Sequence, residues 1–107
     1  MATQTAQAEL TTSAGTIYTA ARKGQITACD AFNKTGTART VTVYVIKAAD
    51  TSASAATCVY VGTVPDNASG SHLQIPLSSQ CLEPGDYVQA LAAANSAINL
   101  KISVAES

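Results

Sequence analysis

Apolar and polar residues alternate along several short segments of this chain. The clearest is the segment Thr40–Lys47 (TVTVYVIK), in which the three valines share one face of an extended strand. Thr42, Tyr44 and Ile46 share the other face, so both faces are largely apolar. We expect this strand to be central in a sheet, or to have one face covered by another sheet or subunit.

Segments of similar composition recur along the chain, separated by turn-forming residues, and this spacing is typical of a sandwich or barrel. They contain nearly all of the Val, Ile, Tyr and Phe residues, which favour strands. The sequence therefore predicts an all-β protein, a single antiparallel β-sandwich of the jelly-roll or immunoglobulin-like kind with about seven to eight strands. The predicted strands are 17–20, 25–32, 39–47, 57–64, 72–77, 86–93 and 98–104.

The connections between these segments favour antiparallel pairing. Residues 33–37 form a predicted turn with Gly36 at its tip, and residues 65–71 (PDNASGS) are rich in turn formers. In Glu83-Pro-Gly-Asp86, Pro and Gly occupy the central positions of a type II turn. We expect Asp86 to accept hydrogen bonds from backbone N–H groups of that turn.

Alanine leaves helix open as an alternative in three places. Residues 48–56 (AADTSASAA) are predicted as an exposed, mobile connection, but their Ala content also permits a short helix. Helix is a further alternative for residues 4–10 and 90–97. For the latter we favour a strand followed by a turn, because residues 87–91 alternate and Asn95-Ser96 interrupts the pattern.

The N-terminal residues 1–14 (MATQTAQAELTTSA) have one large aliphatic side chain, Leu10, among Thr, Gln and Ala. Such a segment cannot close a core by itself, so we expect an extended N-terminal arm before a β-sandwich domain at 15–107. The arm is either a frayed terminus or a segment that orders on a neighbouring subunit.

Composition indicates one small domain with a thin core. The chain has 107 residues, 6 basic and 7 acidic side chains and a formal net charge of -1, and Ala is as frequent as Val, Ile, Leu and Phe combined. We expect it to gain stability by packing on copies of itself or on a partner. The scattered basic residues argue against nucleic acid or an anionic membrane as a partner. The polar start lacks the regions of a signal peptide, which predicts synthesis in the cytoplasm.

Residues that usually carry chemistry are few and dispersed. His72 is the only histidine, and its place at the start of an alternating segment predicts an exposed or strand-edge position. The thiols of Cys29, Cys58 and Cys81 could form a zinc site with His72, but the close cysteine pairs of such sites are missing, so we expect buried free thiols. No two aspartates lie close together in the sequence: they are Asp30, Asp50, Asp66 and Asp86. The sequence predicts no catalytic residue, no cofactor and no metal.

The four tyrosines are the best candidates for a recognition surface. They could anchor an interface or stack on sugar rings, although packing within the sheets is the commoner role for strand tyrosines. Two aliphatic residues near the N-terminus complete the set. The predicted interface residues are Leu10, Ile17, Tyr18, Tyr44, Tyr60 and Tyr87.

The order of several motifs carries a resemblance. TTSAGTIYTA (11–20) is followed by KGQITA (23–28), TGTARTVTVYVI (35–46), LEPGDYVQA (82–90) and ANSAIN (94–99). This series resembles a group of small tailed-bacteriophage virion proteins, in which an LYT-x-PAGK-x-A opening leads to a TVTVYV strand, an L-x-x-GD-x-I-x-A turn and strand, and SAAN-x-VN. The chain departs from that pattern at residues 21–24 and in the segment 58–67.

The resemblance implies a structural protein of the virion with no catalytic residues to transfer. The first expectation is a decoration or cement protein that stabilises the capsid, forming a homotrimer and contacting the major capsid protein. The alternative is a tail, baseplate or fibre component, as an adaptor or host-contacting domain. A carbohydrate-binding module is a third possibility, and an enzyme is the least expected.

Overall fold

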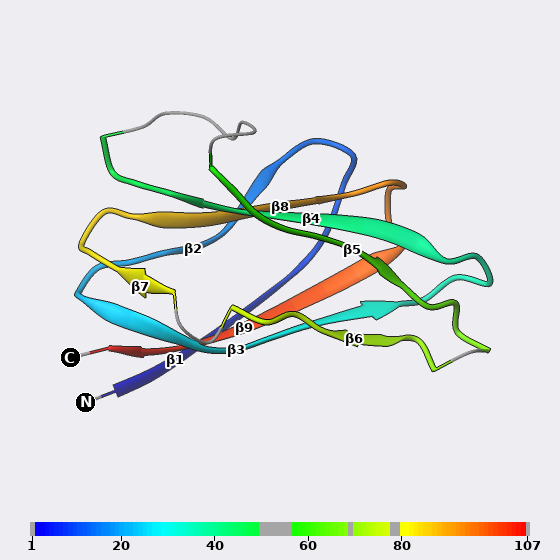
Figure 1. Cartoon of the computed structure of the whole chain (residues 1–107), viewed down its shortest axis with the longest axis horizontal. Coiled ribbons are helices and arrows are strands. Elements are labelled where there is room, and N and C mark those ends of the chain that lie inside the picture. Colours follow the sequence, from blue (N-terminus) through cyan, green and yellow to red (C-terminus); the bar gives the residue numbers. More distant parts are fainter. Residues whose placement is uncertain (1, 50–56, 69, 78–79, 107) are drawn as a thin grey trace.

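The computed structural model describes residues 2–49, 57–68, 70–77 and 80–106. Within these residues all regular structure is β, arranged as two antiparallel sheets that lie one above the other in Figure 1. The all-β prediction is confirmed. None of the described residues belongs to a helix that is long and apolar enough to cross a membrane. The strands are β1 (Ala2–Glu9), β2 (Gly15–Thr19), β3 (Gly24–Asn33), β4 (Arg39–Ile46), β5 (Cys58–Val64), β6 (His72–Gln74), β7 (Cys81–Leu82), β8 (Tyr87–Ala92) and β9 (Ile98–Glu106).

The strand pairs are nested along the chain. The first sheet has the order β1-β9-β3-β6, with β7 also paired to β3, and the second has the order β2-β8-β4-β5. The pair β4–β5 is innermost in sequence, followed outward by β3–β6, β2–β8 and β1–β9. The chain is thus folded back on itself, and its two ends lie beside each other (Figure 1).

The inner faces of both sheets contribute to one hydrophobic core. Their buried residues are Val, Ile and Leu, supplemented by Cys29 and by alanines such as Ala31, Ala90 and Ala92. Alternation explains this arrangement, because every second residue of β4, β8 and β9 points to the same side. The largest fully buried residues from the two sheets include Ile26, Leu82, Leu100 and Ile102 on one side and Val41, Val43 and Val88 on the other.

Each of the seven predicted strand segments contains a strand. The segment predicted at 72–77 is shorter than expected, since β6 ends at Gln74, just before Ile75 and Pro76. The favoured reading of residues 90–97, strand followed by turn, is confirmed, and the helix alternative at residues 4–10 is wrong. Most of the connection predicted at 48–56 lies outside the described residues. The two-residue strand β7 was not predicted.

The N-terminal segment differs from the predicted arm. Ala2–Glu9 pairs with β9 of the same chain over its whole length, and Leu10 is 2% exposed within the core. The physical reason is that a strand joins the edge of a sheet through backbone hydrogen bonds, which do not need large side chains. Residues 2–10 therefore belong to the folded unit.

Candidate functional site

The outer face of the second sheet carries apolar side chains. In β4 the valines are buried, so Thr42 and Tyr44 point to the outside. Thr42 lies opposite Leu91 of β8 and Val61 of β5 in the register, and directly paired residues share a face. Tyr87 precedes the buried Val88 and faces outward as well. We name the outward residues Thr42, Tyr44, Val61, Tyr87 and Leu91 the apolar face.

Val61 is the most exposed large hydrophobic residue of the apolar face, with 60% of its surface accessible. The next register row consists of Thr16, Gln89, Tyr44 and Cys58, so neither row contains a charged side chain. Hydrophobic residues scattered singly over a surface are ordinary, but contiguous apolar patches mark sites of contact. The apolar face is the first candidate surface.

The outer face of the first sheet is polar. Glu9, Asn99, Phe32 and His72 form one register row across β1, β9, β3 and β6. The adjacent outward row consists of Gln7, Lys101, Asp30 and Gln74. On β3 and β9 they alternate with buried residues, and on β1 and β6 with partly buried ones. We name these eight residues the polar face.

Three side chains of the polar face form a connected group. Nε2 of His72 lies 3.0 Å from Oδ1 of Asp30, and the His72 ring stacks on Phe32 with centroids 5.0 Å apart and 25° between the planes. Phe32 is 41% exposed. The prediction that His72 is exposed at a strand edge is confirmed, because β6 is an edge strand of its sheet.

The structure does not bring the predicted interface residues together. Tyr44 and Tyr87 lie on the apolar face, whereas Leu10 is in the core and Ile17 packs against it. Tyr60 points inward, where its ring occupies the space that a side chain at Gly62 would need. Val61 and Leu91 were missed. Strand alternation alone could have placed them outward, but their juxtaposition depends on the register of strands distant in sequence.

Tyr18 links the two sheets. Its hydroxyl donates a hydrogen bond to a carboxylate oxygen of Glu106, which is 8% exposed at the end of β9. Burial, together with the hydrogen bond to Glu106 and its charge, raises the pKa of Tyr18 to about 12. A phenol with this pKa stays protonated at neutral pH, so the arrangement is a structural contact between β2 and β9.

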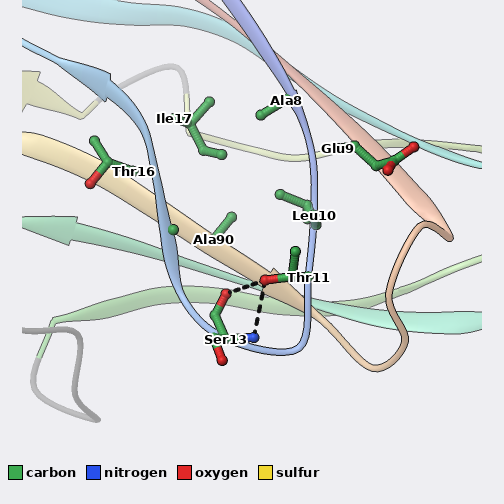
Figure 2. A pocket seen from close by; sticks show the side chains of 9 residues that line it. Ala8, Glu9, Leu10, Thr11, Ser13, Thr16, Ile17 and Ala90 are labelled. Atoms are coloured by element: carbon green, nitrogen blue, oxygen red, sulfur yellow. Dashed lines mark hydrogen bonds between the residues drawn. The ribbon is translucent and has the colours of Figure 1, made fainter.

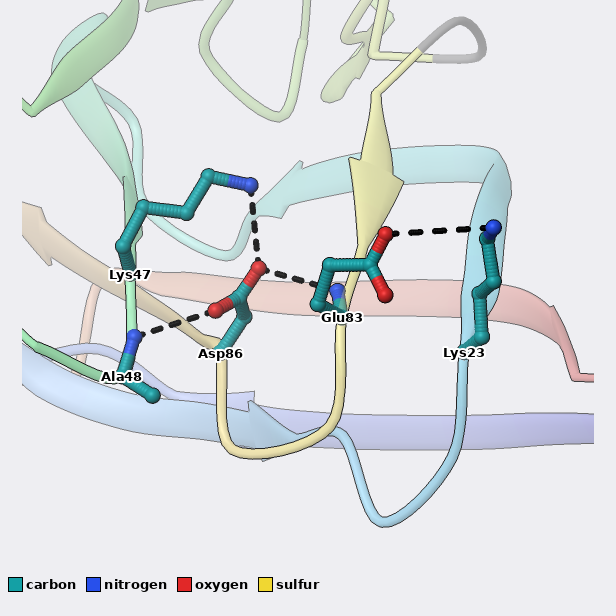
Figure 3. A network of polar contacts seen from close by, with 5 residues as sticks. All are labelled: Lys23, Lys47, Ala48, Glu83 and Asp86. Atoms are coloured by element: carbon teal, nitrogen blue, oxygen red, sulfur yellow. Dashed lines mark hydrogen bonds and ion pairs between the residues drawn. The ribbon is translucent and has the colours of Figure 1, made fainter.

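Asp86 fastens the turn before β8 (Figure 3). Its carboxylate accepts hydrogen bonds from the backbone N–H of Glu83 at 2.9 Å and of Ala48 at 3.0 Å, and from the ammonium of Lys47 at 3.0 Å. Burial opposes ionisation, but these hydrogen bonds and the Lys47 charge lower the pKa of Asp86. The predicted role of Asp86 as acceptor of backbone N–H groups is confirmed.

The turn itself has the predicted type II features. The N–H of Asp86 donates to the carbonyl of Glu83 at 3.0 Å, and Gly85 has a φ of +93°. Only glycine adopts this conformation without strain, which explains the Pro-Gly sequence at its centre. The ionised, hydrogen-bonded Asp86 therefore has a structural role.

A small pocket lies between β1 and β2 (Figure 2). It encloses about 110 Å³, and apolar and polar side chains of the described residues line it in equal number: Ala8, Leu10, Ile17 and Ala90, and Glu9, Thr11, Ser13 and Thr16. At its end Thr11 Oγ1 donates to the carbonyl of Ser13 at 3.0 Å and accepts from the Ser13 N–H at 3.3 Å. Among the described residues that line it, Glu9 is the one titratable side chain. This composition points to imperfect packing between two edge strands.

The cysteines lie in three different environments. Cys29 is buried and burial raises its pKa to about 12, whereas Cys58 is half-buried and Cys81 is exposed. The expectation of buried thiols is therefore right for Cys29 and wrong for Cys81, whose short strand β7 presents it outward. Among the residues that the structure describes, no group of three or more His, Cys, Asp or Glu side chains could hold a metal ion.

Protein-family models, curated proteins and solved structures gave no significant match.

Proposed function

We propose that this protein is a non-enzymatic structural component of a bacteriophage virion. In this proposal it decorates the capsid as a homo-oligomer, a trimer in the simplest arrangement, and cements neighbouring capsid subunits. The order of the sequence motifs supports assignment to a virion. The apolar face supports a role in subunit contacts.

The finer fold assignment is part of the same proposal. Eight of the strands pair in nested fashion, β4 with β5, β3 with β6, β2 with β8 and β1 with β9, with β7 as an addition. Such pairing favours a jelly-roll β-sandwich over the immunoglobulin-like alternative. Jelly rolls occur in viral capsid domains and also in lectins, so this architecture does not by itself decide the function.

The observation that carries the proposal is the composition of the apolar face. Val61 is 60% exposed and lies in one register row with Thr42 and Leu91. Tyr44 lies in the adjacent outward row, and Tyr87 lies in the outward row after that. Cores of protein interfaces are enriched in aromatic residues and depleted of charge. Covering this surface would remove apolar area from water at roughly 25 cal/mol per Å².

The mechanism would be the addition of many modest contacts over the shell. A standard interface buries about 800 Å² on each partner. The whole described surface of the chain is 5360 Å², so contact areas of that size on two neighbours would engage a large share of it. Repeated around a capsid, such contacts resist internal pressure without any single contact being strong.

Copy number tests the proposed location. Particles of the phage that encodes the chain should be purified and the ratio of this chain to the major capsid protein measured by quantitative mass spectrometry. For a decoration protein we expect a copy number per particle that is similar to that of the major capsid protein. A handful of copies per particle would overturn the capsid assignment and favour a tail, baseplate or fibre position, and absence from the particle would overturn the virion assignment.

A further inference from the structure

We propose that the polar face binds a neutral glycan, with Phe32 as the platform on which a sugar ring stacks. The site consists of the outward residues of β1, β9, β3 and β6 that lie in the two adjacent register rows. It is distinct from the apolar face, which belongs to the other sheet, and it adds a ligand to the structural role proposed above.

The polar face offers the groups that recognise sugar hydroxyls. Gln7, Asn99 and Gln74 carry amides that both donate and accept hydrogen bonds, which matches the dual character of a hydroxyl group. Asp30 accepts and Lys101 donates. Phe32 supplies an apolar ring among these polar groups, on which the C–H side of a sugar ring could be buried.

The stacking platform is held in place before any ligand arrives. His72 covers one face of the Phe32 ring from β6, with centroids 5.0 Å apart, and Asp30 holds His72 at 3.0 Å. On the other side of β3 lies β9, whose residue in register with Phe32 is Asn99. An aromatic side chain that is already ordered loses little conformational entropy on binding, which favours affinity.

A hollow lies on the β1–β9 side of the same face. It has a volume of about 200 Å³, and its described lining residues are Gln7 and Asn99, one from each register row, together with Ala8 between Gln7 and Glu9 on β1. Pockets for drug-sized ligands usually enclose roughly 300–1,000 Å³. The smaller hollow is suited to one ring of a longer chain that extends across the face.

The charges of the polar face favour a neutral ligand. Glu9 is paired with Lys34, and Asp30 is paired with His72. Lys101 stands in the same row as Asp30, so neither sign of charge dominates the surface. A sulfated or uronic-acid glycan would need a basic cluster, which these residues do not form.

The recognition groups are concentrated at one end of the sheet. Farther along, one outward register row contains Thr5, Ser103 and Ala28, whose side chains are short, and the next contains Thr3, Ala105 and the single amide Gln25. Neither row has an aromatic ring. A surface that contacts only solvent does not require an ordered aromatic ring beside several planar amides. This contrast places the proposed site around Phe32 and Asn99.

The test uses the full chain labelled with ¹⁵N and a panel of neutral polysaccharide fragments: α-glucan, β-glucan, galactan and mannan oligomers. Chondroitin sulfate serves as the anionic probe. We expect at least one neutral oligomer to shift the amide resonances of Phe32, Asn99 and Lys101 at millimolar concentration. Shifts confined to β4, β5 and β8, binding of the sulfated probe only, or no shifts with any neutral oligomer would overturn the proposal.

Variants then test the platform. Phe32→Ala should weaken binding of that oligomer by about tenfold or more, and Phe32→Tyr should keep it within about threefold. Thr5→Ala is the matched control on the same sheet face and should leave the affinity unchanged. A folded Phe32→Ala protein that binds as tightly as the wild type would overturn the assignment of Phe32. Should Phe32→Ala not fold, Asn99→Ala takes its place, with the same tenfold loss expected and unchanged affinity counting against the site.

Discussion

The hydroxyl of Tyr18 on β2 donates a hydrogen bond to the carboxylate of Glu106 on β9, and this bond joins the two sheets. Glu106 pairs in the register with Ala2 of β1 and with Gly24 of β3, so the contact lies where the two ends of the chain meet. This hydrogen bond stabilises the packing of the two sheets, to which a core with few large apolar side chains contributes less. The contact connects the outermost nested pair, β1–β9, with the second sheet.

Removing the Tyr18 hydroxyl should destabilise the protein. Tyr18→Phe leaves the largely buried Glu106 carboxylate without this donor, so we expect the free energy of unfolding in urea to fall by about 1–3 kcal/mol. Tyr44→Phe is the matched control, since Tyr44 lies on the outer face, and it should change stability by less than about 0.5 kcal/mol. Equal stability of Tyr18→Phe and wild type would show that the bond contributes nothing.

The raised pKa of Tyr18 predicts that the stability of the protein depends on pH in the alkaline range. Folding raises the pKa of Tyr18 from 10.0 to about 12, so the folded state holds this proton more tightly than the unfolded state. The stability from this group is complete below pH 10 and is lost as the pH rises toward 12. We expect the difference in unfolding free energy between wild type and Tyr18→Phe to shrink over that range. A constant difference across it would contradict the raised pKa.

The lowered pKa of Asp86 predicts that stability is lost as the pH falls in the acid range. Its lowered pKa means that the ionised form stabilises the fold above the ordinary value of 3.8, and this contribution is lost as the pH falls below it. Asp86→Ala leaves the N–H groups of Glu83 and Ala48 without their acceptor, which should cost about 1–3 kcal/mol at neutral pH.

The control for Asp86 is its neighbour Glu83, whose side chain is 60% exposed and lies 3.9 Å from Lys23. Glu83→Ala should cost less than about 0.5 kcal/mol, because exposed ion pairs contribute little. Thermal unfolding at neutral and acid pH checks both variants. A loss for Asp86→Ala that persists undiminished well below pH 3.8 would contradict the proposed role of the ionised carboxylate.

Leu10 tests whether the N-terminal segment belongs to the folded unit. It is 2% exposed in the core, so Leu10→Ala should lower the free energy of unfolding by about 2–5 kcal/mol. Thr12→Ala, two residues away at an exposed position, should have little effect. If Leu10→Ala unfolds at the same urea concentration as wild type, residues 1–14 behave as the independent arm that their composition predicts.

Local patterning was sufficient to predict most strands. The valines of β4 and the alternation of β8 identify their buried faces, and the Pro-Gly turn identifies the start of β8. Edge strand β1 could not be found in the same way, since its partner β9 supplies backbone hydrogen bonds and its own side chains are small or polar. β7 is too short to show any period.

The candidate surfaces could be predicted only in part. Tyr44 and Tyr87 were selected from residue type and lie on the apolar face. The row formed by Leu91, Thr42 and Val61, like the stack of His72 on Phe32, joins residues far apart in sequence. Such groupings depend on strand order and register, which are set by tertiary pairing and leave no local signal.

Binding to capsids that lack this chain is the most direct test of the structural role. Purified wild-type protein and Val61→Asp, which places a charge in the apolar face, should be added to particles from a phage in which the gene is deleted. Co-sedimentation is measured, with Thr3→Asp on the other sheet as control. We predict that wild type and Thr3→Asp bind in many copies and that Val61→Asp, still folded, does not. Saturating binding by Val61→Asp, or no binding by wild type, would contradict the account.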